Sequence, residues 1–422
     1  MGSWLGFTAH YFVMKQHRVA ITGVGIVSCL GVGVERVTAS LREGRSGIVV
    51  DEERQQLGFR SPLTGRLPEV FPELVLSRKQ RKTMPDFAQH AYVAVREALG
   101  QAGFKDEELR NPQSGLIFGC DSSCRAAVEQ VDLLRQYGET HKLGSGLVFR
   151  AMTSAITMNL NVLLGTQGAS WTLSSACSSS GHAIGQAADL IALGRQERVI
   201  CGGAQELNWE SMCSFDALGA FSTRIDNPTA ASRPFDADRD GLVPSGGAAA
   251  LVLENYELAQ RRGATLLGEV KGYGFSADGL NLSVPSSEGL ARAMRAALSD
   301  ADTEPEEVSL LLAHATSTPA GDAAEAENIR TVFGTAMPYI SALKALTGHE
   351  LWMAGAATAV YAVAMAEAGF MAPTINFEGP DAATAGLRML NKILLQKPAK
   401  VLCNAAGFGG SNASLLLDFS SQ

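Results

Sequence analysis

One cysteine in the sequence has neighbours that suit nucleophilic catalysis. Cys177 lies in the run SSACSSSGH, residues 174–182, where small side chains flank it on both sides. A cysteine at the start of a helix has its thiolate favoured by the helix dipole and by unpaired backbone N–H groups. The same N–H groups can hold a developing oxyanion. Cys177 is therefore a candidate nucleophile, whereas a buried structural role is the expectation for Cys29, Cys201, Cys213 and Cys403.

Two histidines stand in matching sequence settings. His314 follows the apolar run 308–313, and His349 ends the run KALTGH just before an Ala-rich segment. The carboxyl end of a strand is where α/β sheets place ligand sites. Either histidine alone would more often be an ordinary hydrogen-bonding residue. Together with Cys177, the pair favours a site with one thiol and two imidazoles.

The elements that must position these side chains alternate between short apolar runs and helical patterns. This alternation predicts an α/β architecture. The predicted strands are 19–25, 116–119, 171–174, 199–203, 248–254, 308–313, 339–343, 400–404 and 414–419, and the clearest predicted helices are 87–101, 185–193, 322–333 and 354–368.

The two halves of the chain follow the same plan. Strand 171–174 leads into a small-residue helix near Cys177, and strand 339–343 leads into another near His349. We predict an N-terminal extension at 1–17 (an expression tag or an upstream start), a half carrying the nucleophile at 18–260, and a half carrying both histidines at 261–422. The two halves, joined around 255–270, are expected to pack as one body around a shared centre.

Composition excludes several classes of function. With 46% hydrophobic and 18% charged residues and a net charge of -8, the chain is neither disordered nor generally basic, so nucleic acid is not an expected partner. No run of ~20 uncharged apolar residues predicts a membrane span; the segment 351–366, interrupted by Gly355, is interpreted as a buried helix. Residues 1–13 contain no lysine or arginine, unlike a secretory signal.

Cofactor motifs are also missing from the sequence. Seven cysteines without a CxxC pair indicate neither a disulfide framework nor a zinc site, which favours a reduced, cytoplasmic enzyme. The turn GVG at 23–25 lacks the third glycine of a dinucleotide fingerprint.

Four motifs in order resemble those of the β-ketoacyl-acyl-carrier-protein synthases, the elongating condensing enzymes of the thiolase superfamily. They are SAC at 175–177, HATSTP at 314–319, KALTGH at 344–349 and GFGGSN at 407–412. The segment 207–247 resembles the bacterial type I enzymes in particular, and the resemblance runs from about residue 18 to 418. It implies the thiolase fold, two duplicated α/β halves in a five-layer αβαβα arrangement.

The resemblance implies a decarboxylative condensation in fatty acid or related polyene and polyketide synthesis. Cys177 would take an acyl group from acyl carrier protein, and His314 and His349 would stabilise the enolate formed from malonyl-carrier protein. The N–H groups of Cys177 and Phe408 would form an oxyanion hole. Lys344 would set the charge around the second histidine, with Glu325 as its partner.

Further expectations follow from the same resemblance. Thr316 and Thr318 would meet the phosphopantetheine arm, and Phe408 would gate the acyl pocket. No bound cofactor or metal is expected, because the carrier protein supplies the phosphopantetheine. The enzyme would form a homodimer, or a heterodimer with a related subunit, and the basic run 78–82 is either the landing patch for the acidic carrier or an ordinary solvated helix face.

The chain departs from the family pattern next to the expected site. Glu350, Leu351, Trp352 and Met353 replace residues that are usually small, Ala315 replaces a glycine, and 405–406 are both alanine. These changes suggest a reshaped acyl channel and a specialised enzyme, or drift that neighbouring positions offset. The main alternative is a non-catalytic chain-length-factor-type partner subunit, although such partners typically lack the nucleophilic cysteine. A thiolase or a cysteine hydrolase fits the motifs less well.

Overall fold

The computed structural model describes residues 17–70 and 76–420, so the expected extension 1–17 lies outside it except for its last residue. Ten strands run in the order β11-β10-β12-β13-β9-β1-β8-β7-β5-β6, and β2 (Gly31–Val32) pairs with β1 at the side. The first-half strands are β1 (Val19–Ser28), β5 (Ser114–Gly119), β6 (Ser170–Leu173), β7 (Arg198–Gln205) and β8 (Gly247–Asn255). The second-half strands are β9 (Gly268–Ala277), β10 (Leu310–Leu312), β11 (Tyr339–Ser341), β12 (Lys400–Gly407) and β13 (Ser411–Asp418).

The two halves repeat one topology. Spatial order β6-β5-β7-β8-β1 in the first half matches β11-β10-β12-β13-β9 in the second, strand for strand in chain order. In each half, the first three strands of that order are parallel and the last two pairings are antiparallel. The halves join where β1 pairs with β9 at Ala20–Glu269 and Ile21–Gly268. The internal duplication expected from the sequence is therefore present in the fold.

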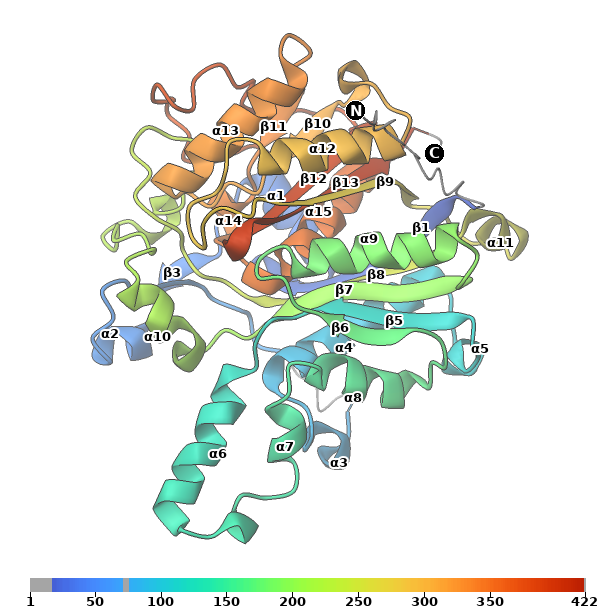
Figure 1. Ribbon diagram of the computed structural model, residues 1–422, viewed down its shortest axis with the longest axis vertical. Coiled ribbons are helices and arrows are strands. Elements are labelled where there is room, and N and C mark those ends of the chain that lie inside the picture. Colours follow the sequence, from blue (N-terminus) through green and yellow to red (C-terminus); the bar gives the residue numbers. More distant parts are fainter. Residues whose placement is uncertain (1–16, 71–75, 421–422) are drawn as a thin grey trace, which may run out of the picture.

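Helices cover the outer faces of the two halves of the sheet and fill the space between these halves, which gives the five layers of the thiolase fold (Figure 1). Helices α4 (Asp86–Ala102) and α8 (Ala155–Leu164) cover the first-half sheet, and α12 (Gly289–Asp300) and α13 (Pro319–Phe333) cover the second. The central layer holds α9 (Ser179–Ala192) and α15 (Ala354–Ala368), which are topological counterparts.

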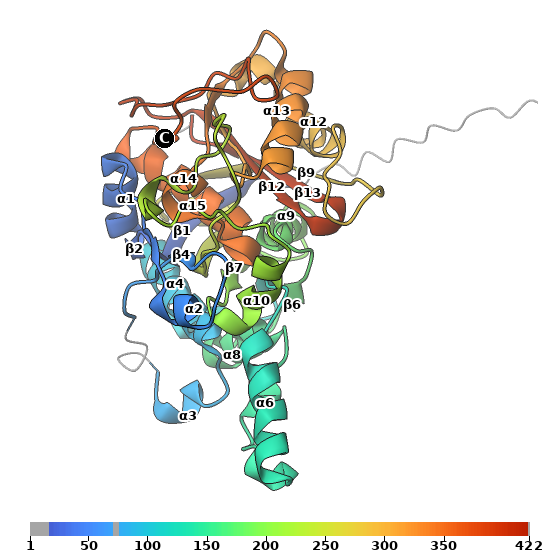
Figure 2. The ribbon, with the colours of Figure 1, turned by 90° about the vertical axis from the view of Figure 1, so that its left-hand side faces the viewer.

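The remaining elements are shorter or lie outside these layers. They are α1 (Val34–Glu43), β3 (Ile48–Val50), α2 (Glu52–Gln56), β4 (Leu63–Gly65), α3 (Arg78–Arg81), α5 (Asp106–Leu109), α6 (Cys124–Tyr137), η2 (Thr140–Lys142), α7 (Leu147–Arg150), α10 (Trp209–Ala217), η3 (Pro228–Ala230), α11 (Tyr256–Arg261), η4 (Pro305–Glu307), α14 (Lys344–Thr347), η5 (Leu351–Met353) and η6 (Phe408–Gly410). Helix α6 projects away from the body, and α7 returns beside it (Figures 1 and 2).

Two glycines allow the central helices to touch. A Cβ atom on Gly355 of α15 would lie 2.5 Å from the backbone nitrogen of Gly181 in α9, so a larger residue there would force the helices apart. Residues 354–366 of α15 are all buried, which explains why its apolar residues show no helical periodicity. The stretch 351–368 has the length and composition of a membrane span, but 89% of it is buried inside the protein, as its interpretation as a core helix predicts.

The predicted strands and helices are present in the structure, but several of them have different bounds. Strand β10 covers only three residues of the predicted 308–313, whereas β12 continues three residues beyond the predicted end at 404. Helix α9 starts at Ser179, six residues earlier than the 185–193 pattern indicated. Strand β9 and the helices α6, α8 and α12 had no counterpart among the predicted elements.

Candidate active site

Cys177 lies in a tight turn between β6 and α9. The preceding residue, Ala176, has a left-handed backbone with φ 49°, a conformation that costs energy for a residue with a Cβ. The turn is held by the Ser179 hydroxyl, which accepts from the Ser175 N–H at 2.8 Å and donates to the Ala176 carbonyl at 2.6 Å. This turn places the Cys177 thiol two residues before the helix, and Cys177 is only 6% exposed.

His349 contacts the thiol directly. Its Nε2 lies 3.1 Å from the Cys177 sulfur, and its backbone N–H donates to the Val243 carbonyl at 2.6 Å. The His314 ring stands edge-on to the His349 ring, with centroids 5.1 Å apart. The structure thus brings together one thiol and two imidazoles from three distant parts of the sequence.

Burial controls the protonation of all three groups. It raises the pKa of the Cys177 thiol to about 12, against the opposing effects of the Lys344 charge and of the N–H groups of Cys177 and Phe408. The N–H group of Cys177 at the helix start favours the thiolate, as expected, but desolvation outweighs this effect in the resting site. Burial and the Lys344 charge hold the pKa of both histidines well below the usual value, so both rings are neutral near pH 7. A neutral imidazole beside a protonated thiol can accept its proton.

Lys344 lies 4% exposed near these groups, and burial lowers its pKa. The carboxylate with the largest effect on it is Glu325, the predicted partner. No ion pair within 4 Å joins the two in the described part of the chain; the Glu325 carboxylate instead accepts from the N–H groups of His314 and Ala315, at 2.9 and 2.6 Å, and from Asn404 at 3.1 Å. Glu325 therefore fixes the backbone at His314 and acts on Lys344 at longer range.

A second buried carboxylate acts on Lys344, at a position where the sequence pattern indicates only added volume. Glu350 is 2% exposed and accepts from the Tyr361 hydroxyl at 2.6 Å. Burial raises its pKa to about 7, while Tyr361 and Lys344 oppose that shift. The signal available in the sequence was a carboxylate directly after the second histidine, inside an otherwise apolar run.

The catalytic candidates line a cavity of about 410 Å³. Cys177, His314 and His349 share it with Thr316, Thr318 and Phe408 and with the loop 281–286. The Phe408 side chain is 43% exposed, and the next residue, Gly409, donates its N–H to the Leu282 carbonyl at 2.8 Å. This hydrogen bond connects the loop 281–286 to the segment that carries Phe408, and both segments line the cavity.

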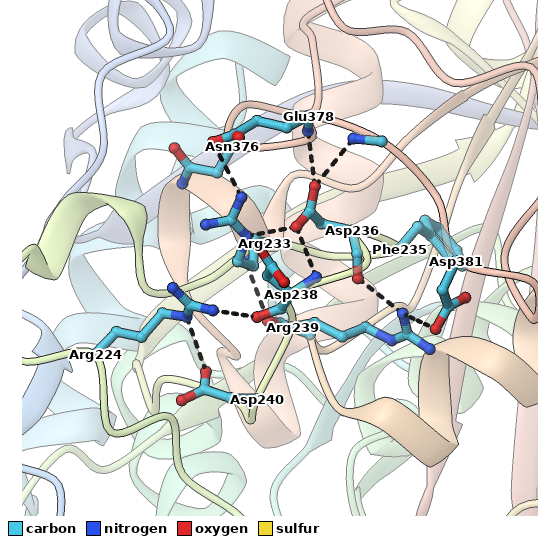
Figure 3. A network of polar contacts seen from close by, with 12 residues as sticks. Arg224, Arg233, Phe235, Asp236, Asp238, Arg239, Asp240, Asn376, Glu378 and Asp381 are labelled. Carbon is cyan, nitrogen blue, oxygen red and sulfur yellow. Dashed lines mark hydrogen bonds and ion pairs between the residues drawn. The ribbon is translucent and has the colours of Figure 1, made fainter.

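A polar network holds the threonine loop against the first half of the chain. The buried Asp322 carboxylate accepts from the N–H groups of Phe235 and Ser317 at 2.8 and 3.1 Å, and both of these residues have left-handed backbones, with φ of 64° and 67°. Around them, Arg233 pairs with Asp236 at 2.7 Å and Arg239 with Asp381 at 2.9 Å (Figure 3). Burial raises the pKa of Asp322 to about 7. The network positions the loop that carries Thr316 and Thr318.

Within residues 17–70 and 76–420, no group of three or more His, Cys, Asp or Glu side chains is placed to hold a metal ion. The donors that the site offers are backbone N–H groups, imidazoles, hydroxyls and one ammonium group. This set suits acyl transfer through a thioester and stabilisation of an oxyanion or enolate.

Comparison with known proteins gives a consistent result over nearly the whole chain. Residues 16–259 match the family model of the β-ketoacyl synthase N-terminal domain, and residues 267–378 match that of the C-terminal domain. The chain is 41% identical over 403 residues to 3-oxoacyl-[acyl-carrier-protein] synthase 1 of Escherichia coli, covering 95% of this chain and 98% of that protein.

Solved structures agree with the family models. A β-ketoacyl synthase from Burkholderia phymatum superposes with a TM-score of 0.90 at 34% identity, covering 95% of this chain and 99% of that one. The ishigamide ketosynthase/chain length factor superposes with a TM-score of 0.89 at 31% identity, covering 96% and 99%.

Replacing His349 by alanine tests whether the imidazole activates the thiol. We expect alkylation of Cys177 by iodoacetamide at pH 7 to slow by about tenfold or more, because the neutral thiol loses its neighbouring base. In the unsubstituted protein the rate should keep rising between pH 7 and 9 without a plateau, since the thiol pKa is about 12. Peptide mass spectrometry gives both rates, and the exposed Cys213 serves as the internal reference. Equal Cys177 labelling in the two proteins would contradict this role.

Proposed function

The chain belongs to the β-ketoacyl synthase family, and from this premise we propose that it acts as a 3-oxoacyl-[acyl-carrier-protein] synthase in fatty acid or related synthesis. The observation that carries the proposal is the 3.1 Å contact between His349 Nε2 and the Cys177 sulfur, with His314 edge-on beside it, inside a cavity. The enzyme would be an acyltransferase of the cytoplasm.

The first half-reaction moves an acyl group onto Cys177. His349 accepts the thiol proton as the sulfur attacks the acyl thioester carbonyl of the carrier protein, and the pantetheine sulfur leaves as a thiol after taking up a proton. The N–H groups of Cys177 and Phe408, which already favour negative charge on the sulfur, would hold the oxyanion that forms during attack.

The second half-reaction forms the carbon–carbon bond. Malonyl-carrier protein loses carbon dioxide, and the electron pair of the broken C–C bond passes into the thioester as an enolate. His314 and His349 donate hydrogen bonds to the enolate oxygen from neutral rings; for His349 this requires the tautomer with the proton on Nε2, which is not the tautomer that accepts the thiol proton. The carbanion attacks the acyl carbonyl, and Cys177 leaves as the thiolate and regains a proton.

The phosphopantetheine arm would reach the site through the opening beside Phe408. Thr316 and Thr318 line this cavity, and their hydroxyl oxygens lie 3.1 Å apart, so they offer adjacent hydrogen-bonding groups to the amides of the arm. We propose that the carrier protein brings this group and that the chain holds no cofactor of its own.

The chain-length-factor alternative remains a second candidate, because the ishigamide ketosynthase/chain length factor shares this fold at a TM-score of 0.89. Trp352 beside the site is the observation that favours it. The intact arrangement of Cys177, His314 and His349 favours the catalytic proposal.

Intact-mass spectrometry separates these two functions. Mixed with a panel of acyl-carrier proteins, the chain should gain the mass of one acyl group, and Cys177→Ala should gain none, because only the sulfur can form the new thioester. The acyl group that reacts fastest identifies the substrate class. No adduct from any donor would contradict catalysis and support the partner-subunit alternative.

The basic run 78–82 is the proposed landing patch for the carrier protein. Arg78, Lys79 and Lys82 are exposed, and the Lys82 ammonium donates to the Ser145 hydroxyl at 2.9 Å, which links α3 to the loop before α7. An exposed cluster of one sign steers an oppositely charged partner despite the net charge of -8.

Charge reversal tests this patch. Lys79→Glu with Lys82→Glu should raise KM for acyl-carrier protein by about tenfold, with the effect shrinking at high salt. Acylation by a small thioester that lacks the carrier should not change. The matched control, Arg261→Glu with Lys392→Glu, alters two other exposed positions by the same charge. Equal KM values for the two double variants would show an ordinary solvated helix face.

We also propose that the chain dimerises through β6. This strand ends the sheet, so its outer edge offers unpaired backbone groups, and the adjoining surface exposes Trp171 by 39% and Val162 by 83%. An exposed strand edge with apolar neighbours favours pairing with another chain. An identical partner chain would give a homodimer, and a related partner chain would give a heterodimer.

Val162→Asp tests the surface with little risk to folding, because this side chain is mostly exposed in the single chain. Light scattering should show twice the monomer mass for the unsubstituted protein and the monomer mass for Val162→Asp, since a buried unpaired charge disfavours the interface. The matched control is Leu395→Asp, because the Leu395 side chain is 75% exposed on another part of the surface. This variant should stay dimeric. A monomeric unsubstituted protein would leave a related subunit as the partner; a dimeric Val162→Asp would place the interface elsewhere.

A further inference from the structure

The indole of Trp352 occupies a defined position behind the wall of the cavity that holds the nucleophile. Trp352 is 7% exposed and belongs to the same buried apolar cluster as Cys177 and Leu351. Its Nε1–H donates to the Ser122 hydroxyl at 3.2 Å, and that hydroxyl donates to the Glu206 carboxylate at 3.3 Å. Glu206 also accepts from the N–H of Cys124, the first residue of α6, at 2.5 Å. The indole is therefore linked through Ser122 and Glu206 to the start of α6.

The backbone that follows His349 packs closely against the first half of the chain. A Cβ on Gly203 of β7 would lie 3.0 Å from the Cα of Met353, and the backbones of Gly355 and Gly181 are in contact as described above. Leu351 has a left-handed backbone with φ 45°, which turns its own side chain into the cavity ahead of Trp352. The segment after His349 thus sends Leu351 into the cavity and Trp352 toward Ser122.

Phe215 connects Trp352 to the cavity wall. The two rings lie 6.4 Å apart, and the Phe215 ring stacks on Phe408 at 6.1 Å and on Phe221 at 6.4 Å. Phe215, Leu351 and Phe408 line the cavity that holds Cys177, and Trp352 lies behind them without lining it. An acyl chain that extends inward past Phe215 and Leu351 would meet the indole.

We propose that Trp352 determines acyl specificity by closing the inner end of the acyl pocket, so that Cys177 accepts short acyl chains. This inference rests on the proposed function, since it concerns the acyl group that Cys177 carries. Short chains stop at Phe215 and Leu351. Longer chains require the indole to leave Ser122 and the Phe215 ring, which removes a partly buried hydrogen bond and aromatic packing together.

The test measures acyl transfer from small acyl thioesters of four to sixteen carbons, which avoids any effect of carrier docking. The reaction exchanges one thioester for another: the Cys177 sulfur bonds to the acyl carbon, and the donor sulfur leaves as a thiol. Rates of intact-mass gain are compared for the unsubstituted protein, Trp352→Gly, Trp352→Phe and Ser122→Ala. Thermal unfolding shows whether each variant is folded.

In the unsubstituted protein the rate should fall steeply beyond the chain length that the pocket holds. Trp352→Gly should move this limit by several carbons, with a gain of tenfold or more for the first excluded chains, because each newly buried methylene is worth about fourfold. Short chains should change by less than about threefold. Ser122→Ala keeps the indole and loses its anchor, so it should give a smaller gain in the same direction and serves if Trp352→Gly does not fold.

The outcomes are distinguishable. Unchanged length profiles in Trp352→Gly and Ser122→Ala, with short-chain adducts present, would overturn the role of Trp352 and leave the proposed function standing. Fast transfer of sixteen-carbon chains to the unsubstituted protein would also overturn it. Absence of any adduct in all four proteins would overturn the proposed function and this inference together.

Discussion

The contact between the two central helices is the constraint on which the site depends. Gly181 of α9 and Gly355 of α15 touch through their backbones, so the two halves meet at these helices. Cys177 precedes α9 and His349 precedes α15, and this contact therefore fixes the 3.1 Å distance between thiol and imidazole. Neither half alone carries a complete site. The duplicated topology explains the arrangement, because equivalent strand-to-helix turns from both halves face the same centre.

Burying these groups has an electrostatic cost that the surrounding residues offset. A thiol with a pKa near 12 and two neutral imidazoles form a site with little resting charge. Lys344 is the exception, and it lies within reach of Glu325 and Glu350. A cation held near the sulfur lowers the energy of the thiolate without requiring that thiolate in the free enzyme. Negative charge on the Cys177 sulfur then arises only during the reaction, when the bound thioester can accept it.

The fold class, the duplication and the three side chains that the structure brings together can be predicted from the sequence, because each leaves a recognisable pattern in it. A nucleophile between small residues and a histidine after a strand are visible within ten positions. The contacts that define the site are not local: Trp352 bonds to Ser122, 230 residues away, and Asp322 bonds to Phe235, 87 residues away. Such partners follow from the packing of layers, which no single segment specifies. The raised thiol pKa does not follow from local sequence for the same reason, since burial is a property of the whole fold.

The departures after His349 act as one unit rather than as independent changes of volume. Consecutive residues point in different directions: Glu350 back toward Lys344 and Tyr361, Leu351 into the cavity, and Trp352 toward Ser122. The left-handed backbone at Leu351 makes this divergence possible and carries a cost in strain. Uncompensated drift would leave the Glu350 carboxylate or the indole N–H without a partner, yet each has one at 2.6 and 3.2 Å. A segment whose two polar side chains both have partners, and whose backbone is strained at Leu351, fits a specific pocket shape better than uncompensated change.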